Sequence, residues 1–191
     1  MKNPYFDISE KAEQKRILCD TYAQKFFPLE KIKLLIVGES PPLTGAYFYI
    51  PENLRRRHQG LPAKIFRALF NADTKIDEEQ CKYYLQEFQK HNFLLLDLLS
   101  FPVDCFVSTI RIEFIGKHIS DFINRYNSLE LSKSCNKILI LPSGTCKELY
   151  LKKNKTILNE FRDRDFRIIN WGETETVLRE LYNDFVWKNI L

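Results

Sequence analysis

Four short apolar runs, each about the length of a β-strand, divide the chain. They occupy residues 34–37, 93–96, 138–141 and 166–169, the last with one arginine inside it. The hydrophobic positions are continuous rather than alternating. This indicates strands that are covered on both faces, as parallel strands are when helices pack on each side of the sheet. The pattern therefore predicts a mainly parallel four-stranded sheet.

Segments with helical spacing lie before, between and after these runs. They cover residues 9–27, 62–70, 77–91, 108–126, 145–152, 156–161 and 174–187. In one of them, Ile112, Ile115 and Ile119 fall on a single helical face. Strands that alternate with helices favour an α/β protein, and we expect a three-layer α/β/α sandwich. A chain of 191 residues without an evident linker predicts one domain over residues 1–191.

Composition limits the expected location and cofactors of the protein but identifies no ligand. The sequence contains no apolar run that could cross a bilayer and no apolar leader, so we expect a cytoplasmic protein with no membrane partner. We also expect a monomer. The five cysteines form no Cys-x-x-Cys pair and the three histidines have no metal-ligand spacing, so we expect no metal and no cofactor. A net charge of +4 permits an anionic partner but does not require one.

Ligands of open parallel sheets bind beyond the carboxyl ends of the strands, which directs attention to four loops. The loop after the first run is the most distinctive. It reads Gly38-Glu39-Ser40-Pro41-Pro42, and the aromatic triplet Tyr47-Phe48-Tyr49 follows a few residues later. Glycine and proline suit a rigid turn that lets the backbone approach a ligand closely.

This loop resembles the first motif of the uracil-DNA glycosylase superfamily, of the type GQDPY, GEAPG or GINPG, which is followed by an aromatic residue that stacks on an extruded base. The similarity extends over roughly residues 33–175, with only the first motif sharp. Residues 61–66 resemble the proline-initiated helix of the family, residues 93–97 its second strand, usually written LLLN, and residues 138–143 its third. Residues 166–172 lie where its fourth strand leads into an HPSP-like loop.

The resemblance implies a uracil-DNA glycosylase-like fold. It also implies an enzyme of base excision repair that hydrolyses the N-glycosidic bond of a damaged or deaminated base flipped out of DNA. Such chemistry needs a group that positions water near the sugar and a donor near the leaving base, and stacking offsets part of the cost of base extrusion. The residues implied are Glu39 and Ser40 beside the water, Asn170 near the leaving base, Gly38, Phe48 and Asp97 around the base, and Arg55, Arg56, Arg57 and Ser143 on the DNA backbone.

Three departures from the family pattern leave a second hypothesis open. Ser40 stands where some branches have an acid or an asparagine that positions water. The GEAPG branch likewise has a glutamate at the second position and no acid at the third, so the hypothesis is that Glu39 positions the water here. Asp97 replaces the usual asparagine, and an ionised aspartate only accepts hydrogen bonds, which predicts weaker uracil selectivity and a base with two N–H donors. No histidine occurs in residues 170–174. The alternative is a catalytically silent module that binds a nucleotide or nucleic acid.

Simpler structural roles compete with each of these assignments. Glu39 and Ser40 also suit a capped turn, the aromatic triplet suits core packing, and Asp97 suits a helix or turn cap. The arginines at 55–57 also suit a solvated turn. Cys146, which follows the third run, allows a thiol hydrolase, but a packed cysteine is the more ordinary interpretation.

Overall fold

The computed structural model describes residues 17–18, 21–42, 47–54, 60–103, 108–129, 135, 137–140, 165–169 and 171–188. Its sheet contains four parallel strands in the order β2-β1-β3-β4. The strands are β1 (Leu34–Gly38), β2 (Phe93–Asp97), β3 (Lys137–Ile140) and β4 (Asp165–Ile168). All four predicted strands are confirmed, with boundaries within one residue of those expected.

The helices are α2 (Pro51–Leu54), α3 (Leu61–Phe70), α4 (Glu78–Lys90), α5 (Ser108–Ser128) and α8 (Thr174–Lys188), and a short 3-10 turn, η2 (Trp171–Glu173), precedes α8. The predictions for α3, α4, α5 and α8 are confirmed, whereas α2 and η2 were not predicted. Of the predicted helix at 9–27, residues 17–18 and 21–24 are helical in the described part. The predicted helices at 145–152 and 156–161 lie outside the described residues.

Local sequence explains where two of these helices begin and end. The Asp77 side chain accepts a hydrogen bond from the Gln80 backbone N–H, and the Gln80 side chain accepts one from the Asp77 N–H, which forms a capping box at the start of α4. Proline stands in the first turn of α3, where a missing N–H costs nothing. Asn71 ends α3 with a φ of 52°, a left-handed conformation that asparagine tolerates well.

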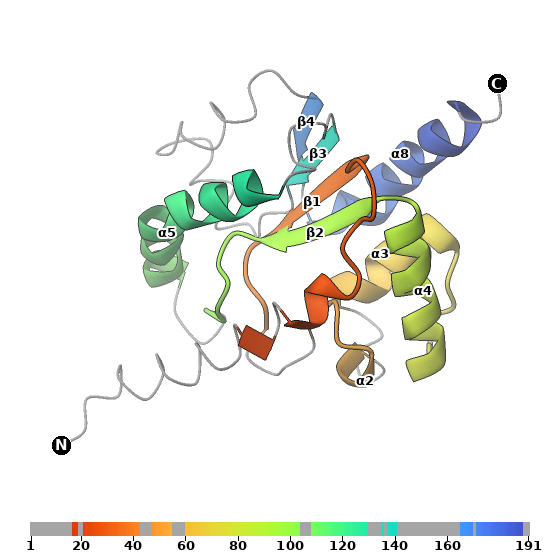
Figure 1. Cartoon of the computed structure of the whole chain (residues 1–191), viewed down its shortest axis with the longest axis horizontal. Helices are drawn as coiled ribbons and strands as arrows, with labels where there is room; N and C mark the ends of the chain where they lie inside the picture. The colour runs from red at the N-terminus through yellow and green to blue at the C-terminus, as the bar shows by residue number, and fades with distance from the viewer. Residues whose placement is uncertain are drawn as a thin grey trace.

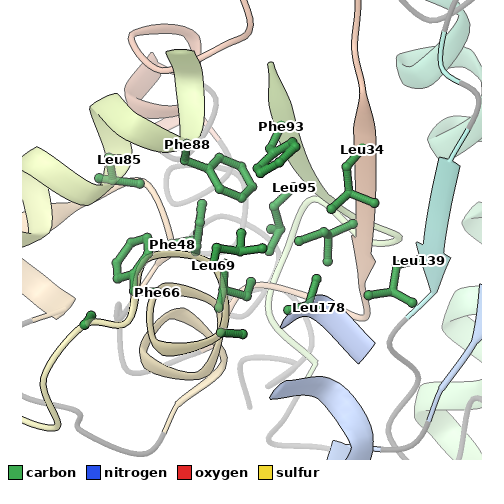
Figure 2. Close-up of a cluster of buried hydrophobic side chains, with 14 of the residues drawn as sticks. Leu34, Phe48, Phe66, Leu69, Leu85, Phe88, Phe93, Leu95, Leu139 and Leu178 are labelled. Carbon is green, nitrogen blue, oxygen red and sulfur yellow. The ribbon is translucent and has the colours of Figure 1, made fainter. Parts of the chain in front are cut away.

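Helices cover both faces of the sheet, which gives three layers (Figure 1). On one face, strand residues such as Leu34 and Leu95 pack against α3, α4 and α8 (Figure 2). On the other face, Leu35 and Leu94 pack against α5 through Ile115 and Phe122. The three-layer α/β/α arrangement predicted from the alternation is therefore observed. Within the described residues, no helix is both long and apolar enough to span a membrane.

Tyr49 lies against the edge strand β2 of the sheet. Its hydroxyl accepts a hydrogen bond from the Leu95 N–H at 2.9 Å and donates one to the Leu95 carbonyl at 3.1 Å. The ring stacks on Phe26 and packs edge-on against Phe27 and Phe48. Burial raises the pKa of Tyr49 well above its usual value, so the hydroxyl keeps its proton. One side chain thus satisfies both edge-facing backbone groups of Leu95.

We predict that Tyr49→Phe lowers the free energy of unfolding by about 2 kcal/mol, because it leaves a buried N–H and a buried C=O without the hydroxyl. Urea denaturation measures the change. Tyr83→Phe is the matched control, since Tyr83 is 55% exposed and its loss of a hydroxyl should change stability by less than about 0.5 kcal/mol. Equal effects of the two substitutions would refute this role for Tyr49.

Candidate functional site

The carboxyl ends of β1 and β2 lie side by side and their loops continue together. Gly38 is in register with Asp97. Beyond the strands, the Leu98 N–H donates to the Gly38 carbonyl at 2.9 Å and the Leu99 N–H donates to the Glu39 carbonyl at 3.0 Å. The first motif is therefore held against the residues that follow β2, at the edge of the sheet where parallel α/β proteins bind ligands.

Gly38 makes this close approach possible. A Cβ atom built at position 38 would overlap Oδ1 of Asp97 and would lie 3.3 Å from its Cγ. Any other residue therefore requires the Asp97 carboxyl to move. The glycine that was predicted to let the backbone approach a base has the Asp97 side chain directly over its Cα, so a contact between Gly38 and a base stays a prediction.

A small cavity of about 70 Å³ opens between these loops. Its lining residues are Ala23, Pro41, Pro42, Tyr47, Phe48, Tyr49, Leu95, Leu96, Asp97, Leu99, Ser100 and Arg125. The structure thus brings the prolines of the first motif, Phe48 and Asp97 to one hollow. Because an apolar cavity that holds benzene measures about 150 Å³, a base-sized ring enters this cavity only if its walls move apart.

Phe48 belongs mainly to the hydrophobic core. Its ring packs against Tyr49 at 4.9 Å, Phe88 at 5.0 Å and Phe66 at 5.4 Å between centroids, and only 7% of the residue is exposed (Figure 2). A stacking platform needs an open ring face. Phe48 lines the cavity, but in this state its core contacts leave little surface for a base.

Glu39 points to α5. Arg111 donates to Oε1 of Glu39 through Nε at 2.7 Å and also through a terminal nitrogen of its guanidinium. The Glu39 side chain is 10% exposed and that of Arg111 is 22% exposed. Glu39 is not among the residues that line the cavity. The predicted convergence of Glu39, Phe48 and Asp97 therefore holds for Phe48 and Asp97 only, because an ion pair draws the Glu39 carboxylate to Arg111.

Asp97 has the most unusual environment in the site. Arg125 donates to the backbone carbonyls of Asp97 at 2.6 Å and Leu98 at 3.0 Å, which fixes the loop after β2. Burial raises the pKa of the Asp97 carboxyl to about 7, although the Arg125 charge opposes the shift, and the charge of Glu39 adds to it. Near neutral pH the carboxyl is consequently present in both protonated and ionised forms.

Sequence reasoning missed the two arginines of α5. Arg111 and Arg125 are about four helical turns apart and so share one face of the helix. This spacing is a usable signal, but the isoleucines dominate the sequence pattern of the helix.

Several predicted site residues lie outside the part of the chain that the structure describes. Arg55, Arg56, Arg57, Ser143 and Asn170 lie outside the described residues, as does Cys146. Ser40 is described and is partly exposed beside Pro41. In the described part of the chain, no group of three His, Cys, Asp or Glu side chains is arranged to hold a metal ion.

Comparison with known proteins found no matching family model, no matching curated protein and no matching solved structure.

Proposed function

We propose that this chain is a divergent uracil-DNA glycosylase-like enzyme that hydrolyses the N-glycosidic bond of a damaged or deaminated base in DNA. One observation carries the proposal: Pro41 and Pro42 of the first motif, Phe48 and Asp97 line a single cavity at the carboxyl ends of two neighbouring strands. Of these residues, Phe48 and Asp97 are two that the resemblance to the superfamily places around the base.

For hydrolysis of the N-glycosidic bond, the protein mainly has to position the water and the base and to supply charge near the sugar. Water adds to C1′ of the deoxyribose, the C1′–N bond breaks, and the base leaves with the bonding electrons and gains a proton. Positive charge builds on the sugar in the transition state, and a nearby carboxylate stabilises it. We assign this role to Glu39, whose carboxylate Arg111 holds in a fixed direction. In this position Glu39 acts as an electrostatic and water-orienting group.

Other parts of the assignment follow the family resemblance. Asp97 reads the edge of the base, Phe48 contributes to the apolar wall, and Asn170 assists the leaving base. The arginines at 55–57 and Ser143 contact phosphates. Since the cavity measures about 70 Å³, base entry requires an outward shift of the loop that carries Pro41 and Pro42. Such movements of binding loops are common on ligand binding.

A second candidate function is a binding module that recognises a nucleotide or nucleic acid without cleaving it. The specific observation in its favour is that Arg111 neutralises Glu39, which does not line the cavity. The two functions share the pocket but differ in whether a base is released.

Release of free base decides between them. Duplexes carrying uracil, hypoxanthine, xanthine or mismatched thymine are incubated with the protein, and the free base is quantified. We expect release from at least one duplex and a loss of about 10²-fold or more in Glu39→Gln, the size expected when a transition-state charge is removed. Glu113→Gln on the exposed side of α5 is the control, because that side chain is 64% exposed. Binding without release selects the second candidate, and equal rates for Glu39→Gln and the native chain remove Glu39 from the mechanism.

A further inference from the structure

One wall of the cavity comes from a segment that precedes the sheet. Ala23 lines the cavity together with residues of the loops after β1 and β2. It belongs to residues 21–27, which we call the cap, and the cap begins as a helical turn in which the Phe26 N–H donates to the Ala23 carbonyl at 2.9 Å. The cap precedes residues 33–175, over which the chain resembles the superfamily, so the resemblance assigns it no role.

Aromatic packing holds the cap against the cavity wall. The Phe26 ring stacks on Tyr49 with 6.4 Å between centroids, and the Phe27 ring packs edge-on against Tyr49 at 6.5 Å. Tyr49 lines the cavity and is hydrogen-bonded to the Leu95 backbone. Because Tyr49 is fixed in this way, separation of the rings moves the cap and takes Ala23 out of the wall.

A side chain of α4 holds the backbone of the cap. Nε2 of Gln89 donates to the Phe27 carbonyl at 2.8 Å and to the Lys25 carbonyl at 3.3 Å. The chain is held again just beyond the cap, where the Glu30 N–H donates to Oδ1 of Asn92 at 3.3 Å. The Gln89 amide therefore binds carbonyls at the end of a helical turn, where backbone acceptors lack helical partners.

We propose that the cap lifts to admit a ligand to the cavity, and that Gln89 is a positioning residue that sets how often it lifts. The cavity measures about 70 Å³, less than half the volume of about 150 Å³ that holds benzene. The cap is thus a second movable wall beside the loop that carries Pro41 and Pro42. The inference rests on the proposed function for the nature of the ligand, whereas the movement itself belongs to the protein alone.

Lifting of the cap is a local opening that leaves the sheet intact. Its contacts are ring packing and hydrogen bonds from one partly exposed amide, and segments held in this way open at a lower cost in free energy than core strands. The hydrogen bonds from Gln89 should therefore control the fraction of molecules in which the cavity is open.

Labelling of Leu99→Cys with N-ethylmaleimide measures access to the cavity without a ligand. Leu99 lines the cavity and is 1% exposed, so a thiol at this position reacts when the cavity opens. In this background Gln89→Ala should raise the labelling rate about tenfold, because the cap loses the amide that binds its carbonyls. Peptide mapping by mass spectrometry separates position 99 from the native cysteines.

Gln80→Ala is the matched control. Its side chain also belongs to α4 and accepts a hydrogen bond from a backbone group, the Asp77 N–H, at the opposite end of the helix from Gln89. This substitution should leave the labelling rate unchanged, and urea denaturation compares the global stability of the variants. Phe26→Leu loosens the cap independently by removing the stack on Tyr49, so it should raise the rate even if Gln89→Ala fails to fold.

The outcomes separate this inference from the proposed function. Labelling at position 99 that is no faster in Gln89→Ala or Phe26→Leu than in Gln80→Ala overturns the inference, even if the chain releases a base from duplexes. Labelling that rises in the cap variants supports it, and if no duplex then releases a base, the cap stands while the glycosylase proposal fails.

Discussion

Gly38→Ala is expected to displace the Asp97 carboxyl and to lower the free energy of unfolding by about 1–3 kcal/mol, because the new methyl group would occupy the position of Oδ1. Base release, or ligand binding if no base is released, should fall by at least tenfold, since Asp97 can no longer face the cavity in the same orientation. Urea denaturation and the base-release assay measure the two effects.

A double-mutant cycle identifies the cause. In an Asp97→Ala background the clashing atoms are absent, so Gly38→Ala should cost much less stability than in the native chain. Gly116→Ala is the matched control, because nothing lies within 4 Å of a Cβ at that position of α5 and alanine favours the helix by about 1 kcal/mol. A cost at position 38 that persists without the Asp97 carboxyl would mean that the backbone itself, rather than this contact, requires glycine.

Arg111→Met is expected to lower the free energy of unfolding by about 2 kcal/mol. The Glu39 side chain is only 10% exposed, so loss of this ion pair removes part of the compensation of a largely buried carboxylate. In a Glu39→Gln background the same substitution should cost about 1 kcal/mol less, because the buried charge is already gone. Denaturation of the native chain, both single variants and the double variant measures this coupling.

An exposed ion pair on α5 is the control for the ion pair of Arg111 and Glu39. Lys117 and Glu113 form an ion pair one turn apart on α5, with side chains 65% and 64% exposed. Breaking this pair with Lys117→Met should change stability by no more than about 0.5 kcal/mol. If the coupling between Arg111 and Glu39 is equally small, the ion pair does not hold Glu39 in place, and its assignment as an oriented carboxylate is wrong.

The sheet was predictable because its strands are continuous apolar runs. Burial on both faces requires such runs, and strands of this kind occur in parallel sheets between helices. Four helices were predictable because their apolar residues recur at helical spacing. The helix α2 is too short to show such a period. The apolar pattern did not predict which strands are neighbours. The adjacency of β1 and β2, which places Gly38 against Asp97, therefore appears only in the structure.

The candidate site was predictable in part. The loop after β1 and Asp97 at the end of β2 were selected because parallel sheets bind ligands there, and both line the cavity. The position of the Glu39 carboxylate was not predictable, because the ion pair with Arg111 joins residues far apart in the sequence. Nor does composition distinguish an aromatic residue that stacks on a ligand from one that packs in the core, and Phe48 does mainly the latter.

We propose that the cavity between the loops after β1 and β2 accepts an extruded base, and Ser100→Leu tests this claim by filling that cavity from its wall. The measurement is the ratio of affinities for a duplex containing 2′-fluoro-deoxyuridine, which resists cleavage, and for the matching undamaged duplex, at about pH 6. We predict that the native chain and the surface control Thr176→Leu prefer the uracil duplex by about tenfold or more, and that Ser100→Leu binds both duplexes equally through their phosphates. An unchanged preference in Ser100→Leu would contradict the claim, because the base would then be recognised elsewhere.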